Sequence, residues 1–354
     1  MRTALITTTI NIPHVLKLYR KLDPSVRFFV AGDEKTPIAA YDFCQSIDNC
    51  VFYSPPMQRD LGYECSRLIG WNTIARRNIA LLEALKRGAD VIITIDDDNI
   101  PISIPYFAVF HELFCGFIFS ELGAGSWSGL KVSSPTYWFD PASLQFPTDG
   151  KPVVQRGFPQ HLSAAGGQAY YEPITDVRIG IAQGMILGDP DTSAVDRISR
   201  HPEVHQVSEL LRAGIVTDPR DTWVPINSQN TAFIRELAPA FLMVPQFKRY
   251  DDILAGLVAQ RAMREKGLYV HLGQPFVFQQ RNTHDLVKDL KSELWGMERI
   301  EHFMQWLSAF PLNPSKGTTC QMRDLFHTFK DEVWQAGVGD LVSAWCNDCE
   351  KVMK

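Results

Sequence analysis

The fold class is decided by the stretch VIITIDDDN, which covers Val91–Asn99. Its first five residues are apolar or β-branched, which is typical of a strand buried on both faces of a parallel sheet. Four polar residues follow directly, and open α/β sheets bind their ligands outside the carboxyl ends of the strands. We therefore predict an α/β fold with a ligand site at the end of this strand.

Segments before this stretch alternate between strand-like and helix-like patterns. The expected strands are Ala4–Thr9, Val26–Ala31 and Cys50–Tyr53, and the expected helices are His14–Leu22 and Asn72–Arg87 with Gly88 as the terminator. This βαβαβ order predicts a doubly wound, mostly parallel sheet.

The rest of the chain suggests a division into two parts. Residues 123–180 are rich in Gly, Ser, Pro and aromatic residues, and the pattern after residue 285 is helical and amphipathic, with a last helix expected over Met322–Gln335. We expect a catalytic domain over residues 1–284, with a nucleotide-binding part over about 1–100 and a sugar and acceptor part over about 101–284. Residues 285–354 form the expected C-terminal helical extension, which would close the site or make a homo-oligomer.

Composition excludes several classes of protein. The 354 residues are 45% apolar and 21% charged, and the net charge of −5 without a basic tract argues against nucleic acid as a partner. No apolar run has the length of a membrane span, and the Thr-rich start does not resemble a signal peptide, so we expect a cytoplasmic protein. Seven cysteines in irregular spacing argue against a disulfide framework. Cys346 and Cys349 lack the second ligand pair of a zinc site and favour two thiols on a C-terminal helix.

The acidic cluster after the central strand indicates a metal site. Asp96, Asp97 and Asp98 repel one another, and each raises the pKa of its neighbours unless a cation lies among them. Carboxylate oxygens suit Mn²⁺ or Mg²⁺, and such an ion would also bind a diphosphate. The alternative is a solvated acidic turn, which the position at a strand end disfavours.

A basic pair near the start of the preceding helix adds a second candidate group. Asn72, Arg76, Arg77 and Asn78 lie about twenty residues before the aspartates. Adjacent helical residues point about 100° apart, so the two arginines cannot easily face one ligand, and one of them is expected on a solvated face.

These residues resemble the glycosyltransferase-A superfamily, in which an Ala-Arg-Asn-like helix precedes a strand and a DxD motif; here Ala75–Asn78 leads to Ile95–Asp98. A closer resemblance, over about residues 3–300, is to the reversibly glycosylated polypeptides, also known as UDP-arabinopyranose mutases, and to STELLO-type glycosyltransferases. The segments that carry it are Thr94–Asp98, Gln155–Pro159, Gly184–Asp191, Asn230–Leu237 and Arg249–Gly256. Phe29–Pro37 and Trp71-Asn72 are more similar to the STELLO side.

The resemblance implies a role for each matching residue. Asp96, Asp97 and Asp98 would hold Mn²⁺ or Mg²⁺ and the diphosphate, and Asp33 would lie near the nucleoside or serve only as a turn residue. Asp251 and Asp252 would lie across the sugar site, or they would be capping charges at a helix start.

Arg156 matches the arginine that becomes reversibly glycosylated in the mutases, and it could instead clamp the diphosphate. Two departures from the mutase pattern stand out. Ser163 replaces a second arginine, which puts mutase activity in doubt, and Gln279 replaces a late histidine. His271 and His284 are the alternative third metal ligands.

Three functions follow from this pattern. The preferred one is a metal-dependent glycosyltransferase that moves a sugar from a nucleoside diphosphate, with a UDP-sugar as the expected donor, to an unknown acceptor. The second is a UDP-sugar pyranose/furanose mutase that is itself glycosylated at Arg156. The third is a non-catalytic subunit that binds a sugar nucleotide, which the intact Asp96–Asp98 cluster disfavours.

Overall fold

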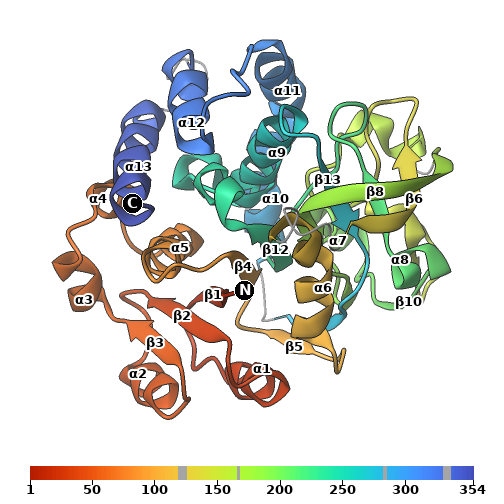
Figure 1. The fold of residues 1–354 in the computed structure, drawn as a ribbon. Helices are drawn as coiled ribbons and strands as arrows, with labels where there is room; N and C mark the ends of the chain where they lie inside the picture. Colours follow the sequence, from red (N-terminus) through yellow and green to blue (C-terminus); the bar gives the residue numbers. More distant parts are fainter. Residues whose placement is uncertain (119–125, 166–167, 282–284, 330–335) are drawn as a thin grey trace.

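A nine-stranded sheet organises the chain in this computed structural model, which describes residues 1–118, 126–165, 168–281, 285–329 and 336–354. The strand order is β13-β11-β6-β8-β12-β4-β1-β2-β3. Figure 1 shows the red-to-orange N-terminal strands on one side of the molecule and the yellow-to-green strands β6 and β8 on the other. The expected glycosyltransferase-A-like α/β fold is confirmed.

The N-terminal half of the sheet is entirely parallel. Its strands are β1 (Thr3–Thr9), β2 (Arg27–Gly32), β3 (Cys50–Tyr53) and β4 (Val91–Ile95). The helices between them are α1 (Leu16–Leu22), α2 (Ile38–Gln45), α3 (Pro55–Asp60), α4 (Glu64–Ile69) and α5 (Arg77–Lys86), which packs on β1 and β2.

The order β3-β2-β1-β4 reverses at β1, because β2 and β3 lie on one side of it and β4 on the other. Open α/β sheets bind ligands at such a switch point. The helix expected over Asn72–Arg87 begins later than predicted: Asn72 has a φ of 59°, and one 3₁₀ turn, η1 (Ile74–Arg76), precedes α5. A positive φ at Asn72 cannot belong to a right-handed helix.

The other half of the sheet is mixed. It contains β6 (Trp127–Ser133), β8 (Tyr170–Gln183), β11 (Ile215–Thr217), β12 (Asn230–Ile234) and β13 (Leu268–Leu272). β12 runs antiparallel between β4 and β8. β13 pairs with both β11 and β8, so β13, β11, β6 and β8 close on themselves.

A second sheet of five short strands has the order β5-β14-β9-β10-β7. The strands are β5 (Asn99–Pro101), β7 (Gln145–Pro147), β9 (Ile186–Gly188), β10 (Val204–Val207) and β14 (Val277–Gln279). The register pairs Gln279 with Asn99. A late segment of the chain is thereby brought beside the acidic cluster.

The remaining helices are α6 (Tyr106–Ile118), α7 (Ala194–Ser199), α8 (Glu209–Ala213), α9 (Asp251–Arg264), α10 (Leu286–Met297), α11 (Ile300–Ala309), α12 (Thr318–His327) and α13 (Val338–Val352). α10 packs on the 3₁₀ segment η6 (Pro245–Tyr250), and α13 packs on α4 and α5. None of the helices in the described ranges combines the length and apolar composition needed to span a bilayer.

The last-helix prediction over Met322–Gln335 is wrong at its end. α12 stops at His327, and a further helix, α13, begins after Gly337, whose φ of 82° interrupts helical geometry. Residues 330–335 lie outside the described part of the chain. Cys346 and Cys349 are free, buried thiols on α13, as expected.

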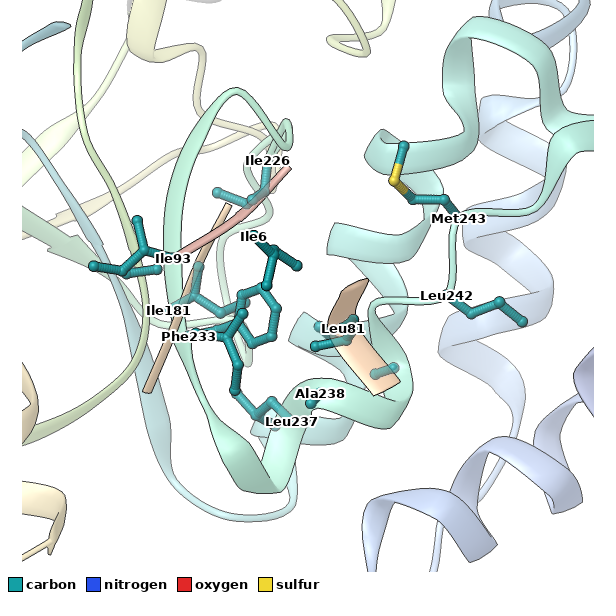
Figure 2. Close-up of a cluster of buried hydrophobic side chains, with 14 of the residues drawn as sticks. Ile6, Leu81, Ile93, Ile181, Ile226, Phe233, Leu237, Ala238, Leu242 and Met243 are labelled. Atoms are coloured by element: carbon teal, nitrogen blue, oxygen red, sulfur yellow. The ribbon is translucent and has the colours of Figure 1, made fainter. Parts of the chain in front are cut away.

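The core between the two halves of the sheet is apolar and draws on distant segments. Figure 2 shows Ile6 of β1, Leu81 of α5 and Ile93 of β4 gathered around Phe233 of β12. Phe233 also stacks on Phe241 with ring centroids 3.8 Å apart. This packing ties β12 to β1, β4 and α5.

Gly296 is expected to be essential for docking α10 onto η6. A Cβ added at Gly296 would lie 2.1 Å from Cγ of the buried Tyr250. Gly296→Ala should therefore lower the free energy of unfolding in urea by about 1–3 kcal/mol, although alanine favours helices. Gly317→Ala is the matched control, because a Cβ there meets no atom within 4 Å. Equal stabilities of the two variants would contradict this packing.

Candidate functional site

The acidic cluster lies at the carboxyl end of β4, and each of its carboxylates has a different partner. Asp96 accepts a hydrogen bond from Arg77 at 2.5 Å, and Asp97 accepts one from the hydroxyl of Thr9 at the end of β1. Asp98 accepts a longer bond, at 3.3 Å, from the side-chain amide of Gln279. Three strand ends, those of β1, β4 and β14, thus meet at the cluster.

Burial and mutual repulsion perturb two of these carboxyls. Burial is the main cause that raises the pKa of Asp97. Burial, followed by the charges of Asp96 and Asp97, raises the pKa of Asp98 to about 6. Such shifts are expected where carboxylates share a site without a cation.

The aspartate cavity, as we name it, opens at the switch point of the sheet and has a volume of about 420 Å³. Its walls come from the ends of β1, β2 and β4 and from the segment before α5. They contain Thr8, Thr9, Ile10, Asn11, Asp33, Lys35, Asn72, Thr73, Ile74, Arg77, Asp96, Asp97 and Asp98. A nucleoside diphosphate has a size that fits a pocket of this order.

Asp33 shapes one wall of the aspartate cavity. Its buried carboxylate accepts hydrogen bonds from the backbone N–H groups of Asn72 at 2.8 Å and Thr73 at 3.0 Å. These bonds hold the turn that Asn72 makes with its positive φ. Asp33 and Asn72 both line the cavity, and the observed contacts of Asp33 are those of a turn-holding residue.

Arg76, Arg77 and Asn78, although adjacent in the sequence, have different hydrogen-bond partners. Arg77 is buried and donates to Asp96, to the hydroxyl of Ser228 at 2.8 Å and to the backbone carbonyl of Ser228 at 2.9 Å. Arg76 is also buried, so the expectation that one of the two arginines lies on a solvated face is wrong. It binds Gln58, with donor–acceptor distances of 2.9 and 2.5 Å. Asn78 exchanges two hydrogen bonds with the backbone of Met243. Only Arg77 of the three lines the aspartate cavity, because successive helical side chains diverge by about 100°.

A second cavity, of about 170 Å³, adjoins the first and shares Ile74, Asp96 and Asp98 with it. We name it the arginine cavity. Its walls contain Ile74, Asp96, Asp98, Arg156, Asp191, Ser228, Gln229, Lys248, Arg249, Asp251, Asp252, Gln279 and Arg281. The three segments at residues 156, 191 and 249–252 reach this cavity from distant parts of the chain.

Arg156 lies between two buried carboxylates. Its Nε is 3.0 Å from one oxygen of Asp191, and its Nη1 is 2.8 Å from one oxygen of Asp252. Nη2 donates to both residues, at 2.9 and 3.0 Å, and Nη1 also donates to the carbonyl of Arg249. All five N–H groups of the guanidinium therefore have acceptors within the protein.

The two adjacent acids at the start of α9 have different surroundings. Asp252 accepts bonds from Arg156 and, at 3.0 Å, from the backbone N–H of Ser228. Asp251 is buried and accepts a bond from the backbone N–H of Asp252 at 2.9 Å. Burial, and then the charge of Asp252, raises the pKa of Asp251. Asp251 is the carboxyl best suited to gain or lose a proton in this cavity.

Sequence reasoning missed several residues of the arginine cavity. Asp191, Ser228, Lys248, Arg249 and Arg281 line it, and none was singled out as a site residue. The match of Gly184–Asp191 to a family segment was the available signal for Asp191. Of the alternative third metal ligands, His271 is buried against Trp127, with ring centroids 5.5 Å apart, and lines neither cavity. His284 lies outside the described residues.

The carboxylate oxygens of the acidic cluster suit a hard divalent cation whose remaining coordination positions are filled by a bound ligand. Within the described ranges, no group of three His, Cys, Asp or Glu side chains is arranged to enclose a metal ion. Mg²⁺ is commonly bound by one or two carboxylates together with substrate phosphates, and Asp96 and Asp98 line both cavities. Burial and the charges of Asp96 and Asp97 raise the pKa of Asp98, so a bound cation would favour the charged form of this carboxyl.

Removing Arg156 should strongly destabilise the fold. Arg156→Ala leaves Asp191 and Asp252 buried without the guanidinium that pairs with both, which should lower the free energy of unfolding at pH 7 by about 3–5 kcal/mol. Burial raises the pKa of Asp191, but Arg156 outweighs burial and lowers it to about 2. Because the unfolded pKa is about 3.9, this stabilisation is present above about pH 4 and is lost as the pH falls towards the folded value.

The deficit of Arg156→Ala should therefore shrink between about pH 4 and pH 2 in chemical denaturation measured across that range. Arg323→Ala is the control, because Arg323 pairs with Glu350 on the surface and should contribute about 0–1 kcal/mol. A deficit no larger than that of the control would contradict a structural role for Arg156.

Comparison with known proteins finds two similarities. Residues 172–335 match the family model described as reversibly glycosylated polypeptide. Over 241 residues, 65% of this chain, the sequence is 25% identical to the probable glycosyltransferase STELLO1 of Arabidopsis thaliana. The aligned part spans 30% of that longer protein. The chain is thus similar to the reversibly glycosylated polypeptides over residues 172–335 and to a STELLO-type probable glycosyltransferase over 241 residues.

Proposed function

We propose that this protein is a metal-dependent glycosyltransferase that uses a nucleoside-diphosphate sugar, with UDP as the expected nucleotide. One observation carries the proposal: the acidic cluster of β4 separates a cavity of nucleotide size from a smaller cavity that contains a buried carboxyl, Asp251. A donor and an acceptor need such adjoining spaces, because the sugar must pass from one to the other.

The aspartate cavity would bind the donor. Asp96 and Asp98 would hold Mn²⁺ or Mg²⁺. The hydrogen bond from Thr9 to Asp97 and the ion pair of Arg77 with Asp96 would keep the cluster in place. When bound, the cation would stabilise the negative charge on the departing diphosphate. The wall formed by Asp33 and Asn72 would face the nucleoside.

The arginine cavity would bind the sugar and the acceptor. Asp251 would accept a proton from the attacking acceptor hydroxyl, since its carboxyl is buried and has a raised pKa. Asp252 and Arg156 would position that segment through their ion pair, and Arg156 would not touch the sugar.

The state of Arg156 favours transfer to an acceptor over mutase activity. A glycosylated arginine requires a nucleophilic, accessible guanidinium nitrogen, whereas Arg156 is 5% exposed and donates all its N–H groups to protein acceptors. Glycosylation would break contacts to two buried carboxylates. The intact Asp96–Asp98 cluster also supports a catalytic site over a non-catalytic binding subunit.

Asp98→Asn is expected to remove the metal dependence. The purified chain should release UDP from a UDP-sugar in the presence of Mn²⁺, and this variant should slow release by on the order of 100-fold, since a cation ligand is lost. Mn²⁺ should also raise the affinity for UDP in the unaltered protein and not in the variant, as measured by calorimetry. Asp60→Asn, at an exposed site outside both cavities, is the control.

The same assay separates the alternatives. Formation of a furanose isomer of the UDP-sugar without net release of UDP would replace transfer by mutase activity. If the unaltered protein forms no product and Mn²⁺ does not raise its affinity for UDP, the catalytic proposal fails.

The pH profile should identify Asp251 as the base. An acceptor base must be deprotonated, so kcat/KM should increase with pH, with a midpoint well above the ordinary carboxyl value of about 4. Asp251→Asn should abolish most of the activity and remove this limb from the residual rate while leaving UDP affinity unchanged. A limb that persists in the residual activity of Asp251→Asn would assign the base to another group.

A further inference from the structure

Lys248 has a backbone conformation that lysine rarely adopts. Its φ of 55° and ψ of −130° break η6 into two helical turns. Contacts of the Cβ atom disfavour these angles, which glycine accepts far more readily. Unfavourable backbone of this kind persists where neighbouring contacts impose it, and it is concentrated at functional sites.

The neighbours of Lys248 impose the turn. Arg249 pairs with the buried Glu293 of α10 at 2.9 Å, and its carbonyl accepts a bond from Arg156. Tyr250 is buried in close contact with Gly296. These contacts explain why the chain turns at residue 248, and none of them involves the lysine side chain.

Lys248 differs from the other cations of the arginine cavity in its ion pairing. Arg156, Arg249 and Arg281 each pair with a carboxylate. Lys248 is exposed, lines the same cavity and forms no ion pair with any residue that the structure describes. It is thus a cation available to a ligand, at a position where glycine would fit the backbone better.

We propose that Lys248 binds the β-phosphate of the donor and so contacts the leaving group directly. This inference rests on the proposed function. Asp96 and Asp98 line both cavities, whereas Lys248 lines only the arginine cavity. A diphosphate held at the aspartates from the nucleotide side therefore presents its sugar-bearing phosphate to Lys248. A lysine ammonium is a common phosphate ligand and acts as a compact point charge.

The test compares UDP with UMP, because only UDP carries the β-phosphate. Lys248→Met keeps the side-chain length and the backbone conformation but removes the charge. In calorimetry on the full chain with Mn²⁺, it should weaken UDP binding by about tenfold or more and leave UMP binding within about twofold. Lys248→Arg should retain UDP affinity. Lys21→Met, at an exposed position of α1 outside both cavities, is the matched control.

A second variant separates charge from backbone strain. Lys248→Gly should lose UDP affinity to the same extent as Lys248→Met, yet melt at a higher temperature, because glycine relieves the unfavourable φ and ψ. A lysine kept for stability alone would give the opposite pattern, with lower melting temperatures in both variants and an unchanged ratio of UDP to UMP affinity.

The outcomes distinguish this inference from the function on which it rests. If the unaltered protein binds UDP and Lys248→Met binds it equally well, or if UDP and UMP weaken together, the role of Lys248 is overturned and donor binding stands. If the unaltered protein binds neither nucleotide, the proposed function fails and the inference fails with it.

Discussion

The arginine cavity depends on the cost of burying charge. Asp191 and Asp252 can remain ionised inside the protein because the guanidinium of Arg156 lies between them and satisfies both. The carbonyl of Arg249 accepts a further N–H of the same group. One side chain therefore joins three segments that are remote in the sequence, and each of them contributes a wall of the cavity.

Adjacent residues of this site have different partners and different roles. Successive helical positions diverge by about 100°, so two adjacent side chains meet different partners even where both line a cavity, as Asp251 and Asp252 do. Arg77 reaches Asp96, whereas Arg76 binds Gln58. Asp252 is held by Arg156, while Asp251 keeps a carboxyl that is free to exchange a proton. The strained turn at Lys248 is maintained by the same network.

Family resemblance and physical environment point in different directions at Arg156. Its position matches an arginine that is glycosylated in the mutases, yet its contacts here are those of a buried structural cation. Where both partners of an ion pair are buried, the partners determine what the group can do more strongly than its place in a motif. The similarity to the reversibly glycosylated polypeptides and STELLO-type proteins therefore supports the class of chemistry. The role of each residue is inferred from its own contacts.

Local patterns in the sequence determined the parallel N-terminal half of the sheet and the position of Asp96–Asp98, because hydrophobic periodicity and strand ends are encoded by residues close together in the chain. The same patterns placed the end of the helix predicted over Met322–Gln335 wrongly, since α12 already ends at His327. Only the tertiary structure decided the contacts of Gln279 with Asp98 and of Arg156 with Asp252, which join residues 181 and 96 positions apart. Such contacts follow from sheet register and from pairing of buried charges, which no local pattern specifies.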